Sequence, residues 1–288
     1  MASAAEETPA IERATQRMAL EVDLAYALRA LEGLGERFAQ LVAAIPNRDA
    51  GAHGLEWTVT ETAVHVLTGL DYYSACIRGS DFGVTPRAAD EPFDTYVARE
   101  NRAQIDAEPE RDPRAIAARL RSSLRDLIDA AAAAGPDATA DFAAGYSEDT
   151  TTSVCTTIGE LIVHGYDIAR TTRSTWEAGT QAAVLAVYAT TASLGLALDR
   201  EAAAGEDIHV RIRLRHGASF SIRIRDGRVW TEISDERPDA TVWAHPLAYL
   251  LVGYGRDSLL RPALRGQLLV WGRKPWVMLK VPKLFLNP

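Results

Sequence analysis

Glu160 and His164 are four residues apart in the segment Glu160-Leu-Ile-Val-His164. In an α-helix this spacing places both side chains on one face, about one turn apart. A carboxylate and an imidazole at this separation can ligate one divalent metal ion, and Asp167 could orient the His164 ring from behind it. The alternative interpretation is a solvated Glu–His pair on an exposed helix face.

His65 is the candidate for a third ligand. It belongs to a helical segment with Glu61, Thr68 and Tyr72 on the same side. Three protein ligands leave coordination positions open, as a catalytic metal requires. Since 95 residues separate His65 from Glu160, only the tertiary fold can bring the two together. By itself, this polar side of the helix also fits a solvent-facing surface.

The pattern around Glu160 favours an interior position for its helix face. At 100° per residue, one polar stripe forms, with apolar residues on both of its borders. Such a stripe is more typical of a helix that faces the interior of a bundle than of one that faces water. The stripe consists of Thr157, Glu160, His164, Asp167 and Thr171, and its borders are Leu161 and Ile168 on one side and Val163 on the other.

Other reactive residues give weaker signals. Cys76 lies on the same helix side as His65, but no adjacent base marks it as a nucleophile, so we interpret it as a bystander thiol. The alternating arginines of 211–225 fit a solvated sheet face better than an anion-binding ladder. The remaining histidines, His53, His209, His216 and His245, are expected to be structural or solvated. No phosphate-binding glycine loop, nucleophile elbow or CxxC pair occurs.

Length and composition limit the classes of protein that remain. The 288 residues predict two domains, and 47% hydrophobic residues indicate globular cores. The net charge of −8 disfavours a nucleic-acid partner. Two cysteines are too few for a disulfide framework and indicate a reducing cytoplasm. We expect no membrane span, because the most apolar stretch, 182–198, is interrupted by Thr, Ser and Gly.

The elements that must position these residues change character near residue 205. Before it, helical periodicity predicts helices at 11–45, 58–79, 92–106, 112–135, 152–172 and 182–199. After it, alternating segments predict a three-stranded β-meander over 210–233 with one apolar and one basic face. A strand at 240–244, a helical stretch from Pro246, a strand at 268–271 and a C-terminal amphipathic helix follow. The predicted fold class is therefore α+β with two domains, a helical bundle over 1–203 and a mainly antiparallel sheet domain over 204–288.

Two segments resemble the mycothiol-dependent maleylpyruvate isomerase family, namely Trp57-Thr-Val-Thr-Glu-Thr-Ala-Val-His65 and Glu160-Leu-Ile-Val-His164-Gly-Tyr-Asp167-Ile-Ala-Arg170. The resemblance implies a DinB-like four-helix bundle in which His65, Glu160 and His164 bind a divalent metal, usually zinc. It also implies mycothiol as the thiol cofactor or co-substrate and an actinobacterial source.

The C-terminal part resembles a sterol-carrier-type domain, which accompanies the metal domain in this family. The matching phrases are Asp239-Ala-Thr-Val-Trp243, Gly255-Arg256 and 266–272. In the isomerases an arginine of this second domain reaches the active site, and the resemblance assigns that catalytic role to Arg256, with Arg273 as the second choice. The ending from Trp271 to Phe285 is closer to a sterol-carrier tail than to the short proline-rich end of the isomerases.

The expected function is that of a cytoplasmic, metal- and mycothiol-dependent enzyme acting on a small electrophilic substrate. Its reaction would be either the cis–trans isomerisation of a maleylpyruvate-like acid or the transfer of the mycothiol sulfur. Its partners would be that substrate and the low-molecular-weight thiol, and its state a monomer or a homodimer. The alternatives are a non-enzymatic carrier that binds an apolar small molecule through its C-terminal domain, and a regulatory zinc module.

Overall fold

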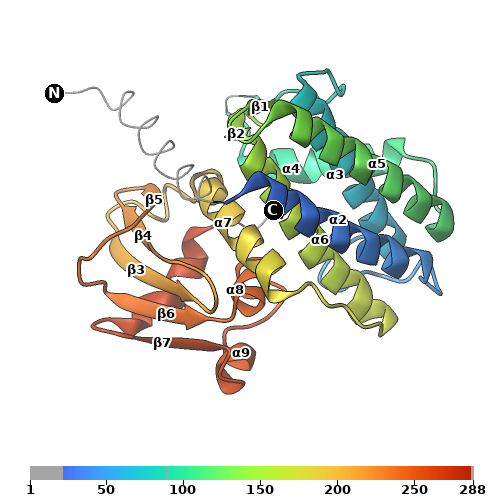
Figure 1. Cartoon of the computed structure of the whole chain (residues 1–288). Coiled ribbons are helices and arrows are strands. Elements are labelled where there is room, and N and C mark those ends of the chain that lie inside the picture. Colours follow the sequence, from blue (N-terminus) through green and yellow to red (C-terminus); the bar gives the residue numbers. More distant parts are fainter. Residues whose placement is uncertain (1–21, 89, 287–288) are drawn as a thin grey trace. The chain divides into compact units, whose positions relative to one another are not determined.

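The computed structural model describes residues 22–88 and 90–286, which form two compact units (Figure 1). The first unit comprises residues 22–186 and is mainly helical. The second comprises residues 187–286 and contains a sheet. The units divide inside α7 (Thr180–Ala197), between residues 186 and 187, which is earlier in the chain than the boundary expected at residue 203.

Four helices of the first unit form a bundle. They are α2 (Leu24–Ala43), α3 (Val59–Arg78), α5 (Pro113–Ala134) and α6 (Thr150–Thr172), and α4 (Phe93–Ala107) packs on α3. Both α2 and α3 contact α5 and α6, so the four helices enclose one core. Fully buried side chains such as Phe38, Leu67 and Ile158 fill it. The predicted helical bundle is confirmed.

Local sequence signals determine where these helices begin and end. Thr58 Oγ1 accepts from the Glu61 amide at 3.1 Å, and Glu61 Oε2 accepts from the Thr58 amide at 2.8 Å, which completes the predicted capping box of α3. Gly79 ends that helix with a φ of 64°. Asp112 caps α5, whose first residue is Pro113. The helix expected over 11–45 is observed as α2, and its residues 11–21 lie outside the described part of the chain.

A short hairpin that the periodicity did not predict precedes α6. It pairs β1 (Thr139–Phe142) with β2 (Tyr146–Asp149) through a turn in which Gly145 has a φ of 85°. Four residues per strand are too few to show a clear alternation. The hairpin leads directly into α6, where Asp149 Oδ1 accepts from the Thr152 amide at 2.8 Å. It therefore sets the starting point of the helix that carries Glu160 and His164.

The second unit contains a five-stranded sheet of order β5-β4-β3-β6-β7. All pairs are antiparallel except β3 with β6. Alternate residues, including Ile212, Ile222 and Val242, are buried on one face, as the meander pattern predicted. The α+β class is thus confirmed. The strands are β3 (Asp207–Leu214), β4 (Ser219–Arg225), β5 (Arg228–Glu232), β6 (Ala240–Ala244) and β7 (Leu268–Gly272), and α8 (Pro246–Gly253) and α9 (Leu260–Leu264) lie between β6 and β7 in sequence.

The prediction of a C-terminal amphipathic helix is wrong. Two short 3₁₀ helices, η1 (Pro275–Leu279) and η2 (Val281–Leu284), occupy this part of the chain. The physical reason is proline: Pro282 has no amide proton and its ring clashes with the preceding turn, so a continuous α-helix cannot pass it. Beyond η2, Phe285 pairs with Leu198 in an isolated β-bridge.

The helix α7 is largely apolar, although Thr, Ser and Gly interrupt it. It is the one helix in the described part of the chain long and apolar enough to cross a bilayer, with 18 residues and a mean hydropathy of 1.2. Its segment 182–187 is buried within the fold, which is equally typical of a core helix. Length and composition alone are therefore weak evidence for a membrane span.

Candidate metal centre

Three side chains from α3 and α6 meet inside the helical unit. Glu160 Oε2 lies 3.2 Å from His164 Nε2 and 3.4 Å from His65 Nε2. The potential ligand atoms of all three residues lie within 4.8 Å of one another. The tertiary fold thus brings together the three residues that the sequence singled out.

The position of this cluster follows from the packing of α6. Its apolar residues Val154, Ile158 and Ile162 are fully buried, and Thr157, His164 and Asp167 of the polar stripe are buried as well. Both sides of the helix therefore face protein. His164 is buried and the Glu160 side chain is 30% exposed, so the structure disfavours the alternative of a solvated Glu–His pair on an exposed face.

Two neighbours hold the imidazole rings in place. His164 Nδ1 lies 3.3 Å from Oδ2 of Asp167, whose side chain is fully buried. This is an ion-pair distance, although the ring is not turned into hydrogen-bond geometry in the described structure. The Trp57 ring packs against His65 with a centroid distance of 5.0 Å. Asp167 therefore lies where a small rotation of the ring would let it accept a hydrogen bond from His164 Nδ1, which would leave Nε2 for the shared site.

A glycine next to His164 admits a tryptophan against α6. A Cβ atom at Gly165 would lie 2.3 Å from the Trp176 ring, closer than any real contact permits. The Trp176 indole donates to the Ile162 carbonyl at 3.1 Å and packs edge-on against Phe38. Gly165 therefore allows close packing behind the helix turn that carries His164.

The charges in the cluster are strongly coupled. Burial alone would raise the pKa of Glu160, yet the His164 and His65 imidazoles hold the pKa of this carboxyl well below its usual range. Burial alone would lower the pKa of His164, but Asp167 and Glu160 outweigh it and raise that pKa to about 9. Burial lowers the pKa of His65 despite Glu160. Near neutral pH, the metal-free cluster therefore contains one carboxylate, one imidazolium and one neutral imidazole.

The donor set fits a divalent transition metal. Two imidazole nitrogens and one carboxylate oxygen are ligands that zinc accepts, and three protein ligands leave a position for an exogenous ligand. The short separations among these donor atoms place them within reach of one ion. The buried Asp167 lies on the side of His164 where metal-bound histidines usually have a hydrogen-bond acceptor.

The arginines predicted from the resemblance lie in the second unit. Arg256 follows α8, and its Nη1 donates to the Tyr254 carbonyl at 2.9 Å. Arg273 follows β7 and pairs with Asp239 at 2.5 Å. The basic sheet face is also largely occupied internally, since Arg211 donates to two backbone carbonyls and Arg223 pairs with Glu232. This disfavours an anion-binding ladder, and it also shows that the face expected to be solvated is partly paired with the protein's own groups.

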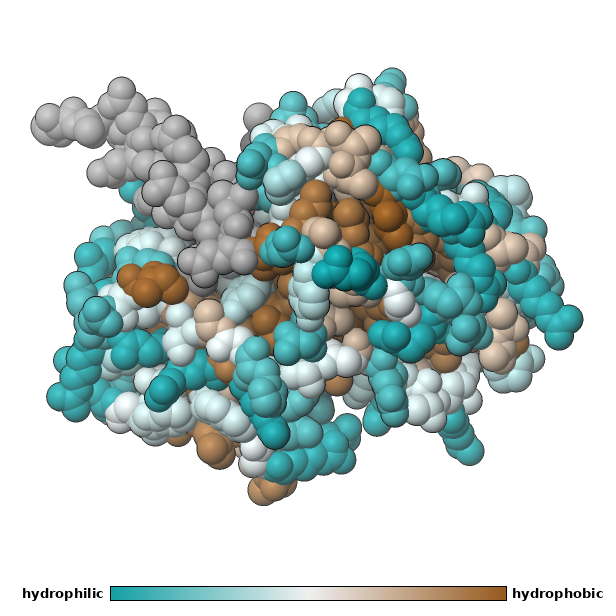
Figure 2. Space-filling model, viewed as in Figure 1, coloured by the Kyte–Doolittle hydropathy of each residue, from teal (hydrophilic) through white to brown (hydrophobic). Residues whose placement is uncertain are grey.

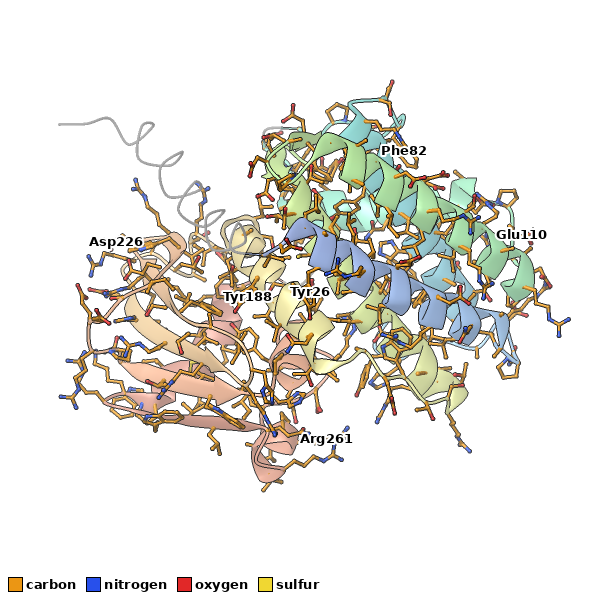
Figure 3. All side chains as sticks on the ribbon, viewed as in Figure 1. Tyr26, Phe82, Glu110, Tyr188, Asp226 and Arg261 are labelled. Atoms are coloured by element: carbon orange, nitrogen blue, oxygen red, sulfur yellow. The ribbon has the colours of Figure 1, made fainter. Side chains whose placement is uncertain are left out.

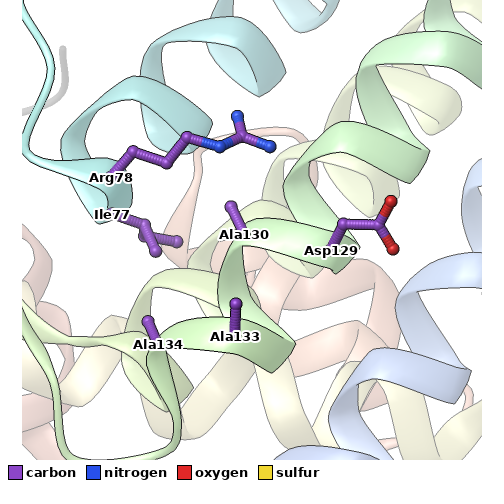
Figure 4. A pocket seen from close by; sticks show the side chains of 6 residues that line it. All are labelled: Ile77, Arg78, Asp129, Ala130, Ala133 and Ala134. Atoms are coloured by element: carbon purple, nitrogen blue, oxygen red, sulfur yellow. The ribbon is translucent and has the colours of Figure 1, made fainter.

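One open hollow lies elsewhere in the helical unit. Its volume is about 450 Å³, and it is lined by the ends of α3 and α5, including Ile77, Arg78 and Asp129 (Figure 4). Ile77 is about three turns further along α3 than His65. This hollow is therefore separate from the histidines and brings no additional reactive group to them.

A buried acid at Glu148 was missed by the sequence reasoning. Its exposed fraction is 6%, and its Oε1 has no hydrogen-bond partner among the described residues. Burial, together with the charge of Asp149, raises its pKa to about 8. No signal marked it, because its burial depends on the hairpin that the periodicity did not show.

Comparisons with known proteins agree with this architecture. Residues 31–169 match the family described as the mycothiol maleylpyruvate isomerase N-terminal domain. The chain is similar to a crystal structure of the mycothiol-dependent maleylpyruvate isomerase, with a TM-score of 0.51 and 14% identity over 83% of this chain and 92% of that one. A histidine-to-alanine mutant of that isomerase matches with a TM-score of 0.51 and 11% identity, over 87% and 93% of the two chains. Among curated sequences, none matches significantly. At such identities the structural likeness concerns the fold.

Proposed function

We propose, from the match of residues 31–169 to the family of mycothiol maleylpyruvate isomerase N-terminal domains, that this chain is a metal- and mycothiol-dependent enzyme acting on a small electrophilic substrate. The observation that carries the proposal is the convergence of His65, Glu160 and His164, with ligand atoms within 4.8 Å of one another, inside that domain.

His65, Glu160 and His164 would hold the metal, and we propose zinc from the donor types. Bound there, a divalent ion supplies the positive charge that lowers the pKa of a thiol ligand. Asp167 would keep a proton on His164 Nδ1, so that Nε2 remains a ligand. Trp57 would cover one side of His65 and exclude water from it.

The thiolate would come from a small molecule rather than from the chain. Burial raises the pKa of the Cys76 thiol, and burial likewise raises that of Cys155 far above its ordinary value. Both therefore remain protonated near neutral pH and are poor nucleophiles. This disfavours nucleophilic catalysis by the protein's own cysteines and favours an added thiol such as mycothiol.

Two reactions fit a thiolate beside an electrophile. In isomerisation, a sulfur–carbon bond forms as the carbon–carbon double bond opens, the remaining single bond rotates, and the sulfur departs as the double bond forms again. In S-transfer, the new sulfur–carbon bond persists and the leaving group departs with the bonding electron pair. We further propose Arg256 as the residue that binds a carboxylate or another anion of the substrate.

Metal content and thiol binding test this function together. We expect about one divalent ion per chain after reconstitution, and loss of that ion in His65→Ala and His164→Ala. His53→Ala is the matched control, since His53 packs on Tyr166 outside the cluster. Calorimetric titration with mycothiol should give heat only with the metal-loaded chain. A wild-type chain that takes up no divalent ion after reconstitution would refute the proposal.

Kinetics with maleylpyruvate and with electrophilic thiol acceptors then separate the two reactions. Arg256→Gln should raise KM for an anionic substrate much more than for a neutral one, whereas Arg225→Gln, a substitution in an exposed sheet arginine, should change neither. The carrier alternative has less support, because Ile212, Phe220 and Ile222 fill the inner face of the sheet with the protein's own side chains.

A further inference from the structure

The second unit exposes an unusual concentration of large apolar side chains. Among the described residues, eight large hydrophobic side chains are exposed, and six of them fall between residues 260 and 279. Leu264 is 80% exposed and Trp276 is 63% exposed. Soluble proteins scatter such residues singly over their surfaces, so a cluster of this kind indicates an interaction surface. We call these six residues the apolar surface: Leu260, Leu264, Leu269, Trp271, Trp276 and Leu279.

Each of the three elements contributes two residues of the apolar surface, and their spacing matches the period of that element. Leu260 and Leu264 are four residues apart on α9, and Leu269 and Trp271 are two apart on β7. Trp276 and Leu279 are three apart on the 3₁₀ helix η1. Each spacing places both members of a pair on one side of their element. Each of these three consecutive elements therefore has one side on which two large apolar side chains are exposed.

The three elements are neighbours in space, because α9 and η1 both contact β7. The strand β7 is also at the edge of the sheet, next to β6 only. Brown apolar side chains reach the surface at the lower edge of the view, where α9 and β7 lie (Figure 1, Figure 2). The residues of the apolar surface therefore lie on three neighbouring elements of the second unit.

Positive charge surrounds these apolar residues. The segment 256–283 contains seven arginines and lysines and a single acid, Asp257, although the whole chain has a net charge of −8. Arg261 extends from α9 and is about half exposed (Figure 3). Within the described part of the chain, cations of this segment form ion pairs with Asp257, Asp239 and Glu206. The segment itself carries a charge of +6, from seven cations minus one carboxylate.

We propose that the apolar surface binds an anionic lipid membrane from one side, without crossing it. Exposed Trp and Leu side chains bordered by Arg and Lys are typical of segments that insert into the headgroup region of a bilayer. The charge of the segment is complementary to anionic headgroups. A second copy of this chain would instead place an equally basic segment opposite the first, which disfavours self-association through this surface. The proposal does not depend on the metal centre, which belongs to the other unit.

Vesicle flotation of the full-length chain tests this proposal. We expect the protein to float with phosphatidylcholine vesicles containing about 30% phosphatidylglycerol at low salt, and to stay unbound with phosphatidylcholine alone. Binding should weaken as salt screens the cations. Tryptophan fluorescence should be quenched by bromine-labelled lipid chains only in the anionic vesicles.

Substitutions identify the surface that binds. The triple variant Leu264→Gln, Trp276→Gln and Leu279→Gln should bind anionic vesicles at least about tenfold more weakly. Ile233→Gln is the matched control, since Ile233 is 71% exposed and lies outside the apolar surface. Arg265→Gln with Lys283→Gln should lower both the affinity and its salt dependence. Circular dichroism and thermal melts verify that each variant is folded.

Three results would overturn the proposal. The first is a wild-type chain that does not bind anionic vesicles at low salt. The second is a folded triple variant that binds as tightly as the Ile233→Gln control. The third is a wild-type dimer, seen by analytical ultracentrifugation, that the triple variant dissociates while neither protein binds vesicles, which would identify a self-association interface instead.

Discussion

Replacement of Glu148 by glutamine should stabilise the protein above neutral pH. Glu148 lies on β2, is almost fully buried, and precedes another buried acid, Asp149. Its pKa is raised from an ordinary 4.5 to about 8, mainly by burial; the Ser153 hydroxyl opposes this effect, and the neighbouring Asp149 charge adds a smaller increase. At pH 7 the folded protein therefore holds Glu148 as a neutral carboxylic acid.

The sign and size of the effect follow from proton linkage. Between pH 4.5 and 8 the folded chain keeps a proton on Glu148 that the unfolded chain has lost, so the free energy of unfolding falls as pH rises through this window. At about 1.4 kcal/mol per pH unit, the loss reaches about 3 kcal/mol by pH 7 and about 4 kcal/mol by pH 8, where half of the folded chains have also lost the proton. Glutamine is neutral at every pH and nearly the same shape, so Glu148→Gln removes this loss.

Urea unfolding at pH 5, 6, 7 and 8 measures the difference between the two proteins. We expect the stability advantage of Glu148→Gln to be small at pH 5 and to grow to about 3 kcal/mol at pH 7. Glu177→Gln, a change at an exposed position, is the control and should leave the pH dependence unaltered. The carboxyl-carbon NMR shift of Glu148 gives its pKa directly. A wild-type-to-variant difference that stays constant from pH 5 to 8 would refute the reasoning.

Three further changes test the surroundings of the metal centre. Gly165→Ala should lower the free energy of unfolding by about 1–3 kcal/mol, because the added Cβ would overlap the Trp176 ring. Gly69→Ala is the control: the space around Gly69 in the middle of α3 is open, so this change should raise stability by up to about 1 kcal/mol. Thermal melts compare the two variants, and equal effects would contradict the packing argument. Asp167→Asn should weaken metal affinity by about 10- to 100-fold through loss of the charged contact with His164. Competition with a chelator measures the affinity, and an unchanged value would show that Asp167 does not support His164 as a ligand. Metal binding at pH 7 should release about one proton, because the pKa of His164 is raised to about 9 in the metal-free cluster. Calorimetry in buffers of different ionisation enthalpy measures the number of protons released. A release of zero would contradict an imidazolium at His164.

The apolar surface shows why exposure is harder to predict than secondary structure. Trp271 and Leu269 alternate with buried or half-buried residues along β7, as in any strand with one inner face. The sequence pattern identifies two faces, but not whether other elements cover the outer one. On β3 and β4 the outer positions hold arginines with their own acidic and carbonyl partners, while on β7 they hold Leu and Trp at the edge of the sheet.

By itself, the sequence determined what depends on neighbours along the chain. The capping box at Thr58, the left-handed end at Gly79 and the Asp112 start were readable, because each involves contacts within about four residues. The spacing of Glu160 and His164 likewise placed them on one helix face. A polar stripe with apolar borders correctly indicated that this face points inward.

Only the tertiary structure decided what depends on contacts between distant segments. It brought His65 to Glu160 across 95 residues, buried Glu148 through a hairpin too short to show a period, and exposed the Trp276 side of the tail. It also showed that Pro282 divides the expected last helix into two 3₁₀ turns. Periodicity records which side of an element is apolar, whereas the pKa of a buried acid and the donor set of a metal site depend on what packs against that side.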